Sequence, residues 1–425
     1  PMSLFRDNPD IIRADHDKRG IPHDSIDEII RLDSEWKGAL HEMEMARRER
    51  NTAARGISEA KKAGDAAEAD RIMAEVADLG TRIETLDERA KGLANERDSL
   101  RMRIPNILHD EVPVGEDEGG NTQHSMHGEK PEFDFEPRVH NELIEMNKWV
   151  ELERAAKIAG SRFYFLKGDL ARLELALQSY SVDFLAQRGF TFVQPPVMMN
   201  RQAYEGVTDL SDFETVMYGV EPDKLYMIAT SEHPLTAMFM DEVIEPSLLP
   251  IKMVGVSPCF RREVGAHGLS DRGIWRVHQF TKIEQIVISH PDESWQHHED
   301  LLQNCIDLWD SLGLHYEVVN ICTGDMGTVA SRKYDLEAWL PGAGAFKEVV
   351  SCSNCTDYQA NRLRMRYRTA DGNEAVHTLN STAVATSRAL VAIMEQNQME
   401  DGRVRIPDVL QPLMNNKETL EPTSF

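Results

Sequence analysis

The sequence predicts an α+β protein: an N-terminal antiparallel two-helix coiled-coil arm, followed by a globular domain built on an antiparallel β-sheet flanked by helices. Three observations lead to this fold class. Leucines recur every seven residues from position 79 to 100, a glycine-containing turn precedes that repeat, and the later chain mixes short β-rich runs with helices in no regular βα order. With 425 residues the chain exceeds the usual size of a single core, so we expect two domains.

The arm is predicted from two rows of apolar residues at heptad spacing. A companion row to the main repeat includes Arg97, and an upstream repeat is interrupted by Asp33. Residues 61–65 (Lys-Lys-Ala-Gly-Asp) predict a helix stop and a tight turn. We therefore expect helices over about 25–62 and 66–103, each roughly 55 Å long. The main row consists of Ile72, Leu79, Leu86, Leu93 and Leu100.

The chain divides by composition into residues 1–104, a linker over 105–136 and a globular domain over 137–425. Pro105 ends the second helix, and residues 109–130, rich in Gly, Asp, Glu and His, predict an exposed linker. The pattern then predicts helices over 138–158, 169–187, 294–312 and 387–398. It predicts strands over 190–193, 251–256, 284–288 and 316–319.

Charge and cysteine content narrow the class of protein. The formal charge of −25 argues against non-specific polyanion binding, so a nucleic-acid partner must meet local basic patches. The chain begins with a polar, acidic segment rather than a signal peptide, and no apolar run approaches the length of a membrane span. The five cysteines are an odd set, which favours reduced thiols. We expect a cytoplasmic protein with no membrane partner.

The most informative segment is a predicted β-hairpin around residues 258–284. Arg261 and Glu263 lie two apart, so on a strand they would point to one face, and the returning strand carries Arg276, Phe280 and Glu284. Arginine binds phosphate oxygens, an aromatic ring stacks on a base and glutamate accepts from amines. The alternative is a solvated salt-bridge face. Because the sequence has no glycine-rich phosphate loop, a nucleotide site here must be built from strand side chains.

Two further segments carry weaker signals. Residues 189–196 predict a helix running into a strand that Pro195 and Pro196 interrupt, which is also typical of an ordinary helix–strand junction. Thr230 and Glu232 offer a hydroxyl and a carboxylate to a small polar ligand. The alternative for the second segment is a helix N-cap, and the two interpretations are compatible.

The segment 347–355 offers metal ligands. Glu348 and Ser351 are hard oxygen ligands, suited to Mg²⁺ held jointly with substrate phosphates. Cys352 and Cys355 have the spacing of half a zinc site, but a structural zinc needs four ligands and the sequence has no second cysteine pair. We expect two small, partly buried thiols and no zinc.

In segment 380–388, small residues precede a predicted apolar helix. They let a strand approach a ligand closely. Arg388 falls at the start of that helix, where its charge opposes the local dipole. That placement is unfavourable unless an anion binds there. The alternative is an arginine that faces solvent.

Taken together, these residues resemble the seryl-tRNA synthetase family of class II aminoacyl-tRNA synthetases, over nearly the whole chain. The three class II motifs match around Pro195, at 260–284 and at 380–388. Asn380-Ser381-Thr382-Ala383 departs from the Asn-Gly-Ser-Gly of many bacterial members and is closer to archaeal and eukaryotic types. The other matching runs are Leu4-x-Arg6-x-Asn8-Pro9, Gly324-Asp325-Met326-Gly327, Tyr334-Asp335-Leu336-Glu337-Ala338-Trp339, the segment 351–360 and Ile406-Pro407-x-x-Leu410-x-Pro412.

The resemblance implies a class II catalytic domain that activates L-serine with ATP and esterifies it to tRNA(Ser), with catalytic roles for Arg261, Arg388 and Glu348. It implies Mg²⁺ on Glu348 and Ser351. The implied ATP-binding residues are Arg261, Arg262, Glu263, Arg276, Val277, Phe280, Glu348, Val349, Val350, Ser351 and Arg388. The implied serine-binding residues are Thr230, Ser231, Glu232, Arg261, Glu284, Asn380 and Thr382.

The arm would contact the long variable arm of the tRNA through Arg47, Arg48, Arg50 and Arg55, although any of these could equally belong to a solvated coiled-coil face. The resemblance also implies a homodimer with motif 1 at its interface. Charging of selenocysteine tRNA stays open. Two other classes remain as alternatives: a paralogue that binds nucleotide without charging tRNA, and a coiled-coil scaffold with a structural globular end.

Overall fold

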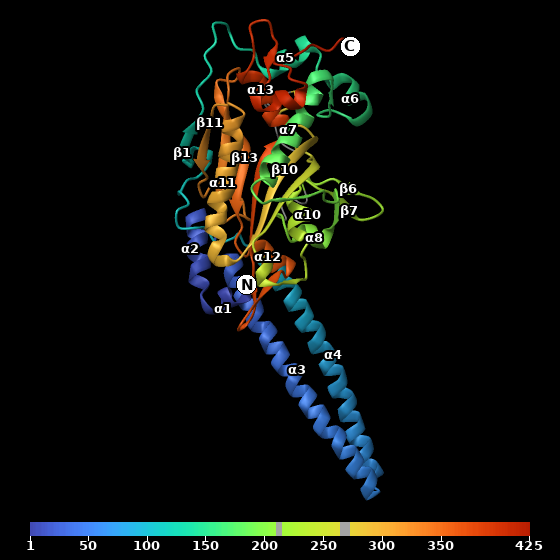
Figure 1. The fold of residues 1–425 in the computed structure, drawn as a ribbon. Coiled ribbons are helices and arrows are strands. Elements are labelled where there is room, and N and C mark those ends of the chain that lie inside the picture. Colours follow the sequence, from blue (N-terminus) through green and yellow to red (C-terminus); the bar gives the residue numbers. More distant parts are fainter. Residues whose placement is uncertain (210–214, 264–272) are drawn as a thin grey trace. The chain divides into compact units, whose positions relative to one another are not determined.

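The computed structural model describes residues 1–209, 215–263 and 273–425. Within this part of the chain, the fold divides into two compact units, Pro1–Ile104 and Pro105–Phe425. The first unit is helical and the second is built on a β-sheet, as Figure 1 shows. The predicted α+β fold class is therefore confirmed.

Two long antiparallel helices dominate the first unit. The predicted turn forms as expected: Gly64 adopts a left-handed conformation with φ of 75°, and the Asp65 side chain accepts a hydrogen bond from the Glu68 amide at 3.0 Å. Buried side chains such as Met43 and Leu86 form the seam between the helices. The four helices of the unit are α1 (Met2–Asp7), α2 (Pro9–Arg19), α3 (Asp24–Ala63) and α4 (Ala66–Arg101).

Two of the polar residues that interrupt the heptad rows pair with each other. Asp33 of α3 and Arg97 of α4 are both buried, and Arg97 Nη1 donates to Asp33 Oδ1 at 2.8 Å. Arg6 of α1 donates to both oxygens of the same carboxylate at 2.7 and 2.8 Å. Arg97 also lies over the Trp36 ring, 4.8 Å from its centroid. This cluster joins three helices and fixes the register of α3 against α4.

The second unit contains, within the described residues, an eight-stranded sheet in the order β1-β11-β12-β13-β16-β10-β9-β4. Neighbouring strands pair antiparallel, except that β4 pairs parallel with β9. The predicted antiparallel sheet is confirmed. Its strands are β1 (Thr122–His127), β11 (Tyr316–Asn320), β12 (Arg332–Leu340), β13 (Ala345–Asn354), β16 (His377–Ala385), β10 (Gln279–Ser289), β9 (Ile251–Phe260) and β4 (Thr191–Val193).

Helices α7, α11 and α13 pack on the sheet and close the main apolar core, which includes the fully buried Trp309 and Tyr316. The α-helices of this unit are α5 (His140–Asn147), α6 (Leu152–Ala159), α7 (Gly168–Ala186), α8 (Arg201–Glu205), α10 (Glu232–Ala237), α11 (Ser294–Ser311), α12 (Tyr358–Leu363) and α13 (Thr386–Gln396). Short 3-10 turns are η1 (Glu118–Gly120), η2 (Pro246–Leu248), η3 (Pro291–Glu293) and η4 (Asp408–Met414).

Smaller sheets lie beside the main one. They are β2 (Val150–Glu151) with β3 (Phe165–Leu166); β5 (Met198–Asn200), β7 (Leu225–Met227) and β6 (Gly219–Val220); β15 (Gly372–Ala375), β14 (Arg366–Thr369) and β8 (Val243–Ile244); and β17 (Val404–Arg405) with β18 (Thr419–Leu420).

Two expectations about local structure are wrong. The helix expected over 138–158 is broken at Lys148, which adopts φ of 55°, because Trp149 turns into the core and β2 then pairs with β3. The segment 109–130, expected to be an exposed linker, contributes β1 to the edge of the sheet, paired with β11. Val112 is buried in an apolar cluster with Val319 and Ile321. The polar composition of 109–130 fits its exposure, since none of the residues of β1 is buried.

Candidate active site

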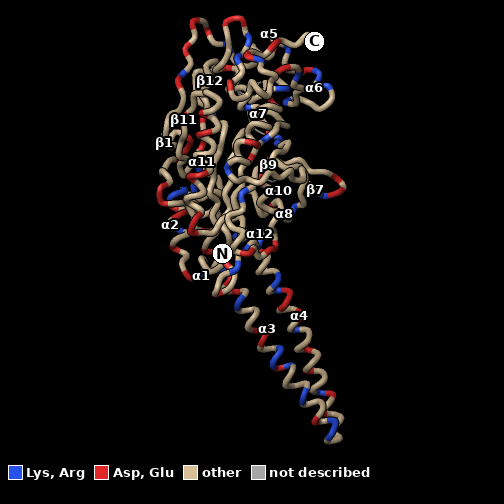
Figure 2. Tube along the Cα trace, in the orientation of Figure 1, with Lys and Arg blue, Asp and Glu red and all other residues tan. Residues whose placement is uncertain are grey.

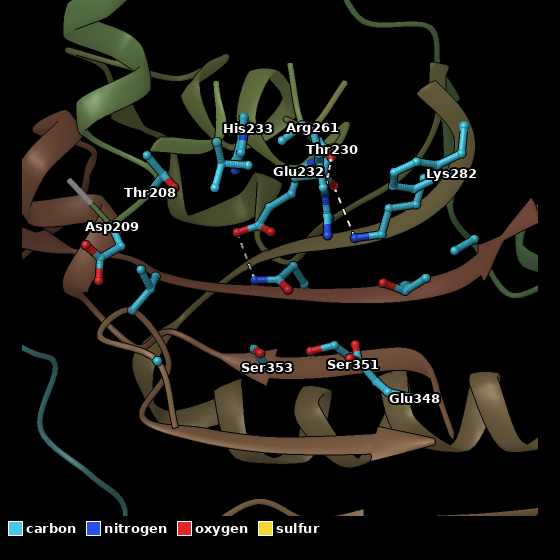
Figure 3. Close-up of a pocket in the computed structure, with 18 of the residues that line it drawn as sticks. Thr208, Asp209, Thr230, Glu232, His233, Arg261, Lys282, Glu348, Ser351 and Ser353 are labelled. Carbon is cyan, nitrogen blue, oxygen red and sulfur yellow. Dashed lines mark hydrogen bonds between the residues drawn. The ribbon is translucent and has the colours of Figure 1, made fainter. Parts of the chain in front are cut away.

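A cavity of about 500 Å³ opens on the sheet and is lined by residues from β10, β12, β13, β16, α10 and α13 and from the segments that flank these elements. Four of the predicted segments meet there: 230–232, 261–280, 348–351 and 380–388. Figure 3 shows Thr230, Glu232, Arg261 and Lys282 on one side of this cavity, with Glu348, Ser351 and Ser353 on a facing strand. A ligand in the cavity would thus touch cations, carboxylates and hydroxyls at once.

Two β-bulges bring the side chains of neighbouring strands onto this face. On β13, Leu336 pairs with Val350 but Glu337 pairs with Glu348, so Val349 is an extra residue. Glu348 and Ser351 are three apart, and in a regular strand they would face opposite sides. The bulge lets both line the cavity. A second register shift on β16, at Ala383, lies beside Thr382.

The α10 side of the cavity is a polar network centred on Glu232. Its carboxylate accepts from Asn380 Nδ2 at 3.1 Å and from Gln359 Nε2 at 2.9 Å, and its amide donates to Thr230 Oγ1 at 3.2 Å. Burial, and then the negative charge of Glu284, raise the pKa of Glu232 to about 7. The N-terminal end of α10 packs closely because Gly255 has no side chain: a Cβ there would lie 2.9 Å from the Ser231 Cβ.

Lys282 and Glu284 form a buried pair on β10 behind this network. Their Nζ and Oε2 atoms lie 2.7 Å apart, and Lys282 also donates to Thr230 Oγ1 at 3.3 Å. Burial raises the pKa of Glu284, while Lys282 opposes that shift. Lys282 lines the cavity and Glu284 does not. Glu284 therefore reaches the cavity through Lys282 and Thr230 rather than directly.

Arg261, Glu263, Arg276 and Phe280 form the second side of the cavity. The Arg261 guanidinium lies 5.3 Å from the centroid of the Phe280 ring, and Arg276 pairs with Glu263 at 3.6 Å. The expected strand alternation of Arg261 and Glu263 is wrong, since β9 ends at Phe260 and Glu263 has φ of 45°. Both residues nevertheless line the cavity. The residues 264–272 of this segment lie outside the described part.

Arg388 and Glu348 close the third side. Arg388 Nη1 donates to the Glu348 carbonyl at 2.8 Å and lies 3.4 Å from its carboxylate, and the guanidinium sits over the Trp275 ring at 5.4 Å. Burial acts to raise the pKa of Glu348, but Arg388, Lys333 and then Arg261 outweigh it and lower that pKa. Glu348 is therefore a carboxylate at neutral pH, and 46% of its side chain is exposed.

The sheet surface next to Glu348, outside the residues that line the cavity, is acidic. Glu317, Glu337 and Glu348 pair directly across β11, β12 and β13. Burial, and then the charges of Glu317 and Glu348, raise the pKa of Glu337 to about 7. Asp335, two residues earlier on β12, pairs with Lys333 at 2.9 Å.

The structure thus brings most of the predicted ligand-binding residues to one cavity. Thirteen of them line it: Thr230, Glu232, Arg261, Glu263, Arg276, Val277, Phe280, Glu348, Val349, Ser351, Asn380, Thr382 and Arg388. Four predicted residues do not line it: Arg262, Ser231, Glu284 and Val350. Ser231 and Val350 are buried, and Arg262 is exposed.

Several lining residues were not predicted. Lys282 and Lys333 add cations, and His233, whose pKa burial lowers to about 3, adds a neutral imidazole that contacts Tyr204. Lys282 could have been found from its period-two spacing with Phe280 and Glu284. Lys333 had no local signal, because it reaches the cavity only through the pairing of β12 with β13.

All five cysteines are free and buried. Cys352 and Cys355 were expected to be partly buried, but both side chains are almost fully enclosed. Cys355 lines the cavity and accepts from Asn380 Nδ2 at 3.5 Å. Burial raises the pKa of both thiols, so they behave as small neutral side chains.

Among the described residues, none of the helices is both long and apolar enough to span a membrane.

An antiparallel sheet whose cavity is lined by arginines, an aromatic ring and carboxylates defines the class: a class II aminoacyl-tRNA synthetase core. The matching family model is the tRNA synthetase class II core domain (G, H, P, S and T), over residues 218–397. The seryl-tRNA synthetase N-terminal domain matches residues 2–108.

Individual relatives agree over the whole chain. A serine–tRNA ligase from Methanoregula boonei is 50% identical over 99% of each chain. The crystal structure of the seryl-tRNA synthetase from Pyrococcus horikoshii complexed with ATP is 43% identical, with a TM-score of 0.93 over 100% of both chains. The cytoplasmic serine–tRNA ligase from Naegleria fowleri in complex with AMP is 33% identical, with a TM-score of 0.89 over 100% of this chain and 99% of that one. The chain belongs to the seryl-tRNA synthetase family.

Proposed function

We propose that this chain is a serine–tRNA ligase that converts L-serine and ATP to seryl-adenylate and transfers the seryl group to the 3′ end of tRNA(Ser). The observation that carries the proposal is the convergence of Arg261, Glu232, Glu348 and Arg388 on one cavity. Arg261 and Arg388 offer cations to a triphosphate, and Glu232 in the same cavity offers a carboxylate to an amino group. The relatives' ligase names support the same activity.

The chemistry requires positioning more than proton transfer. The serine carboxylate attacks the α-phosphorus of ATP, a new O–P bond forms and pyrophosphate leaves with the electron pair of the broken bond. A hydroxyl of the terminal tRNA ribose then attacks the seryl carbonyl carbon, loses its proton and releases AMP. Arg261 and Arg388 would neutralise the charge that develops on the phosphate oxygens. Phe280 offers a face for the adenine base, and Glu263 an acceptor for its amino group.

The α10 side of the cavity suits serine. Glu232 is a partly buried carboxylate that would bind the substrate ammonium, and Thr230, Asn380 and Thr382 offer partners to a hydroxyl. A site built to hydrogen-bond a hydroxyl leaves its own polar groups unpaired when alanine binds, which rejects alanine by roughly 10⁴–10⁵-fold. Threonine would be refused by size, which discriminates less strongly.

The residues fit Mg²⁺ bound jointly with the triphosphate. Glu348 is ionised and half-exposed, and the β13 bulge presents it beside Ser351, giving two hard oxygen ligands on one face. A bound Mg²⁺ would offset phosphate charge during the displacement. Glu348 would then exchange part of its ion pair with Arg388 for the cation, freeing the guanidinium for phosphate.

The helical arm is the proposed tRNA-binding element, acting on the long variable arm. Within the described residues, Arg47, Arg48, Arg50 and Arg55 of α3 form no ion pair, and all but Arg50 are exposed. On α4, by contrast, Arg71 pairs with Glu68 at 2.7 Å. Figure 2 shows the acidic and basic residues interspersed along both helices. Unpaired surface arginines are available to phosphate at little cost.

We also propose a homodimer in the cytoplasm. Leu175 of α7 and Phe192 of β4 are 64% and 50% exposed, on the helix and edge strand of motif 1. A second copy would bury these side chains and cover the β4 edge. The free, buried thiols favour a reducing compartment.

Exchange of labelled pyrophosphate into ATP tests the proposed activation step. Exchange should depend on serine and be at least about 10³-fold slower with alanine at equal concentration. Absence of serine-dependent exchange would instead support a nucleotide-binding paralogue or a scaffold. Equal exchange with threonine would contradict the assigned pocket.

A further inference from the structure

The two strands that end at the cavity are bridged by a residue from a different part of the chain. Arg162 lies in the loop between α6 and β3, 101 residues before Glu263. Its Nη1 donates to the Glu263 carbonyl at 2.7 Å, and its own carbonyl accepts from the His278 amide at 3.0 Å. The loop thus binds one residue on the outgoing side of the hairpin and one on the returning side.

This bridge lies just beyond the end of regular strand pairing. The ladder between β9 and β10 ends at Phe260 opposite Gln279, and one further bond runs from the Arg261 amide to the His278 carbonyl at 3.0 Å. Past that point the chain leaves the strand conformation, and Glu263 adopts φ of 45°. A non-glycine residue in this region is held there by its surroundings.

Further contacts fix the loop itself. Arg162 has φ of 64°, and the ring of Phe163 packs on that of His278 with centroids 5.3 Å apart. The Tyr218 hydroxyl hydrogen-bonds His278 Nδ1 from the opposite side. Burial, and then the Arg162 charge, lower the pKa of His278, so that its ring is neutral at pH 7. Arg162 is therefore one part of a packed cluster that grips both sides of the hairpin.

We infer that Arg162 is a positioning residue for ATP: it holds Glu263 in the conformation that meets the adenine amino group. Arg162 does not line the cavity, whereas Glu263 does. It therefore acts on the cavity through a neighbour, and Glu263, whose carbonyl accepts its hydrogen bond, is a lining residue that it contacts directly. The inference rests on the proposed function, because it takes adenine as the base that Glu263 meets.

The role predicts a selective defect. Loss of a charge-assisted hydrogen bond to the Glu263 carbonyl should raise the KM for ATP about tenfold or more, while the KM for serine changes less than about twofold. Preference for ATP over purine riboside triphosphate, which lacks the 6-amino group, should fall. If Arg162 only stabilised the fold, its loss would raise the KM for ATP and the KM for serine together and leave the preference for the adenine base unchanged.

The test measures exchange kinetics with both nucleotides for the wild type, Arg162→Ala, Arg162→Lys, Glu263→Ala and the double variant Arg162→Ala/Glu263→Ala. Arg162→Lys keeps a donor and should recover part of the ATP affinity. Glu263→Ala should lower the base preference at least as much as Arg162→Ala, and the double variant should lose no more than Glu263→Ala. Arg154→Ala is the matched control: that exposed arginine of α6 forms a surface ion pair with Glu151 at 2.6 Å and its loss should leave the kinetics as in the wild type.

If Arg162→Ala does not fold, Arg162→Asn replaces it in the same measurements. Asparagine tolerates φ near +60°, but its side chain is too short to reach Glu263. An unchanged KM for ATP, an equal loss for serine, or additive effects in the double variant would each overturn the inference. A wild type without serine-dependent exchange would overturn the proposed function itself. If the wild type shows serine-dependent exchange and the Arg162 variant has the same KM for ATP and the same base preference, only the positioning role would be overturned.

Discussion

The helical arm and the catalytic sheet solve different problems with different kinds of contact. In the arm, α3 and α4 are joined by one turn and pack along a single apolar seam. In the sheet, neighbours such as β10 and β16 are separated by about a hundred residues, and their pairing gathers charged side chains into a cavity. A surface that follows a nucleic-acid backbone needs only reach and exposed cations. A site that forms a bond needs convergence, which only non-local pairing supplies.

The arginines of the two regions differ accordingly. Arg47, Arg48 and Arg55 near the tip of α3 are exposed and form no ion pair among the described residues, whereas Arg261 and Arg388 are held by carbonyls and aromatic rings. The arginines near the tip of α3 contribute charge, whereas Arg261 and Arg388 contribute charge at fixed positions in the cavity. The two regions should therefore fail in separable ways.

The largest expected effect comes from removing the outer arm. Replacing residues 44–84 by a short glycine-containing turn keeps the Asp33–Arg97 cluster but deletes Arg47, Arg48 and Arg55. Charging of tRNA should fall by at least about 100-fold, because phosphate contacts supply much of the affinity. Serine-dependent exchange should stay within about threefold of wild type. Charging that persists would show that the arm has a different role.

Arg388→Ala should lower exchange by about 10²–10³-fold, since it removes a cation aimed at the phosphate and leaves Glu348 without its partner. The measurement is steady-state exchange at saturating ATP and serine. Arg403→Ala, at a more exposed arginine that pairs with Asp401, is the control. A near-wild-type rate would remove Arg388 from the site.

Asp33→Ala should destabilise the base of the arm by about 3 kcal/mol, because it leaves the buried Arg97 with only the more exposed Asp98 and also removes the carboxylate that Arg6 binds. Hydrogen exchange of the α3 and α4 amides measures this. The hydrogen bond from Arg6 has the largest influence on the pKa of Asp33 and holds it well below its usual range, although burial acts to raise it. The stabilisation is thus present above pH 4, and the difference from the variant shrinks on acidification. Asp27→Ala, which breaks an exposed pair with Arg13, should cost less than about 1 kcal/mol.

The last prediction is a pH dependence of serine activation. Because the pKa of Glu232 is about 7 and its carboxylate is the form that binds an ammonium, kcat/KM for serine should rise about tenfold per pH unit between 5 and 7 and then level off. Glu232→Gln should lower kcat/KM and flatten that rise. A variant that keeps the wild-type profile would assign the titration to another group, such as Glu337.

The same contrast explains what the sequence could predict. The arm follows from heptad spacing and one turn, since both signals are local, and the predicted helices end within two residues of α3 and α4. Arg97 and Asp33 looked like flaws in that repeat until the structure paired them. In the sheet, the resemblance to a known family located the lining residues, but periodicity alone put Arg261 and Glu263 on a strand that ends before them.

What the sequence could not predict depends on strand register and on distant segments. The bulge at Val349, which brings Glu348 and Ser351 to one face, depends on how β12 pairs with β13. Lys333 lines the cavity and Arg162 bonds a residue that lines it, and both come from positions that no motif marked. The edge strand in the polar segment 109–130 had no alternating apolar pattern to reveal it, because none of the residues of β1 is buried.

The most direct test of the proposed function is charging of total tRNA by this chain with each amino acid in turn. We expect esterification of tRNA(Ser) with serine, less than about one-thousandth of that rate with alanine, and a rate with threonine that is lower than with serine by about tenfold or more. Faster charging with a different amino acid, or serine-dependent exchange without any transfer to tRNA, would contradict the proposed function.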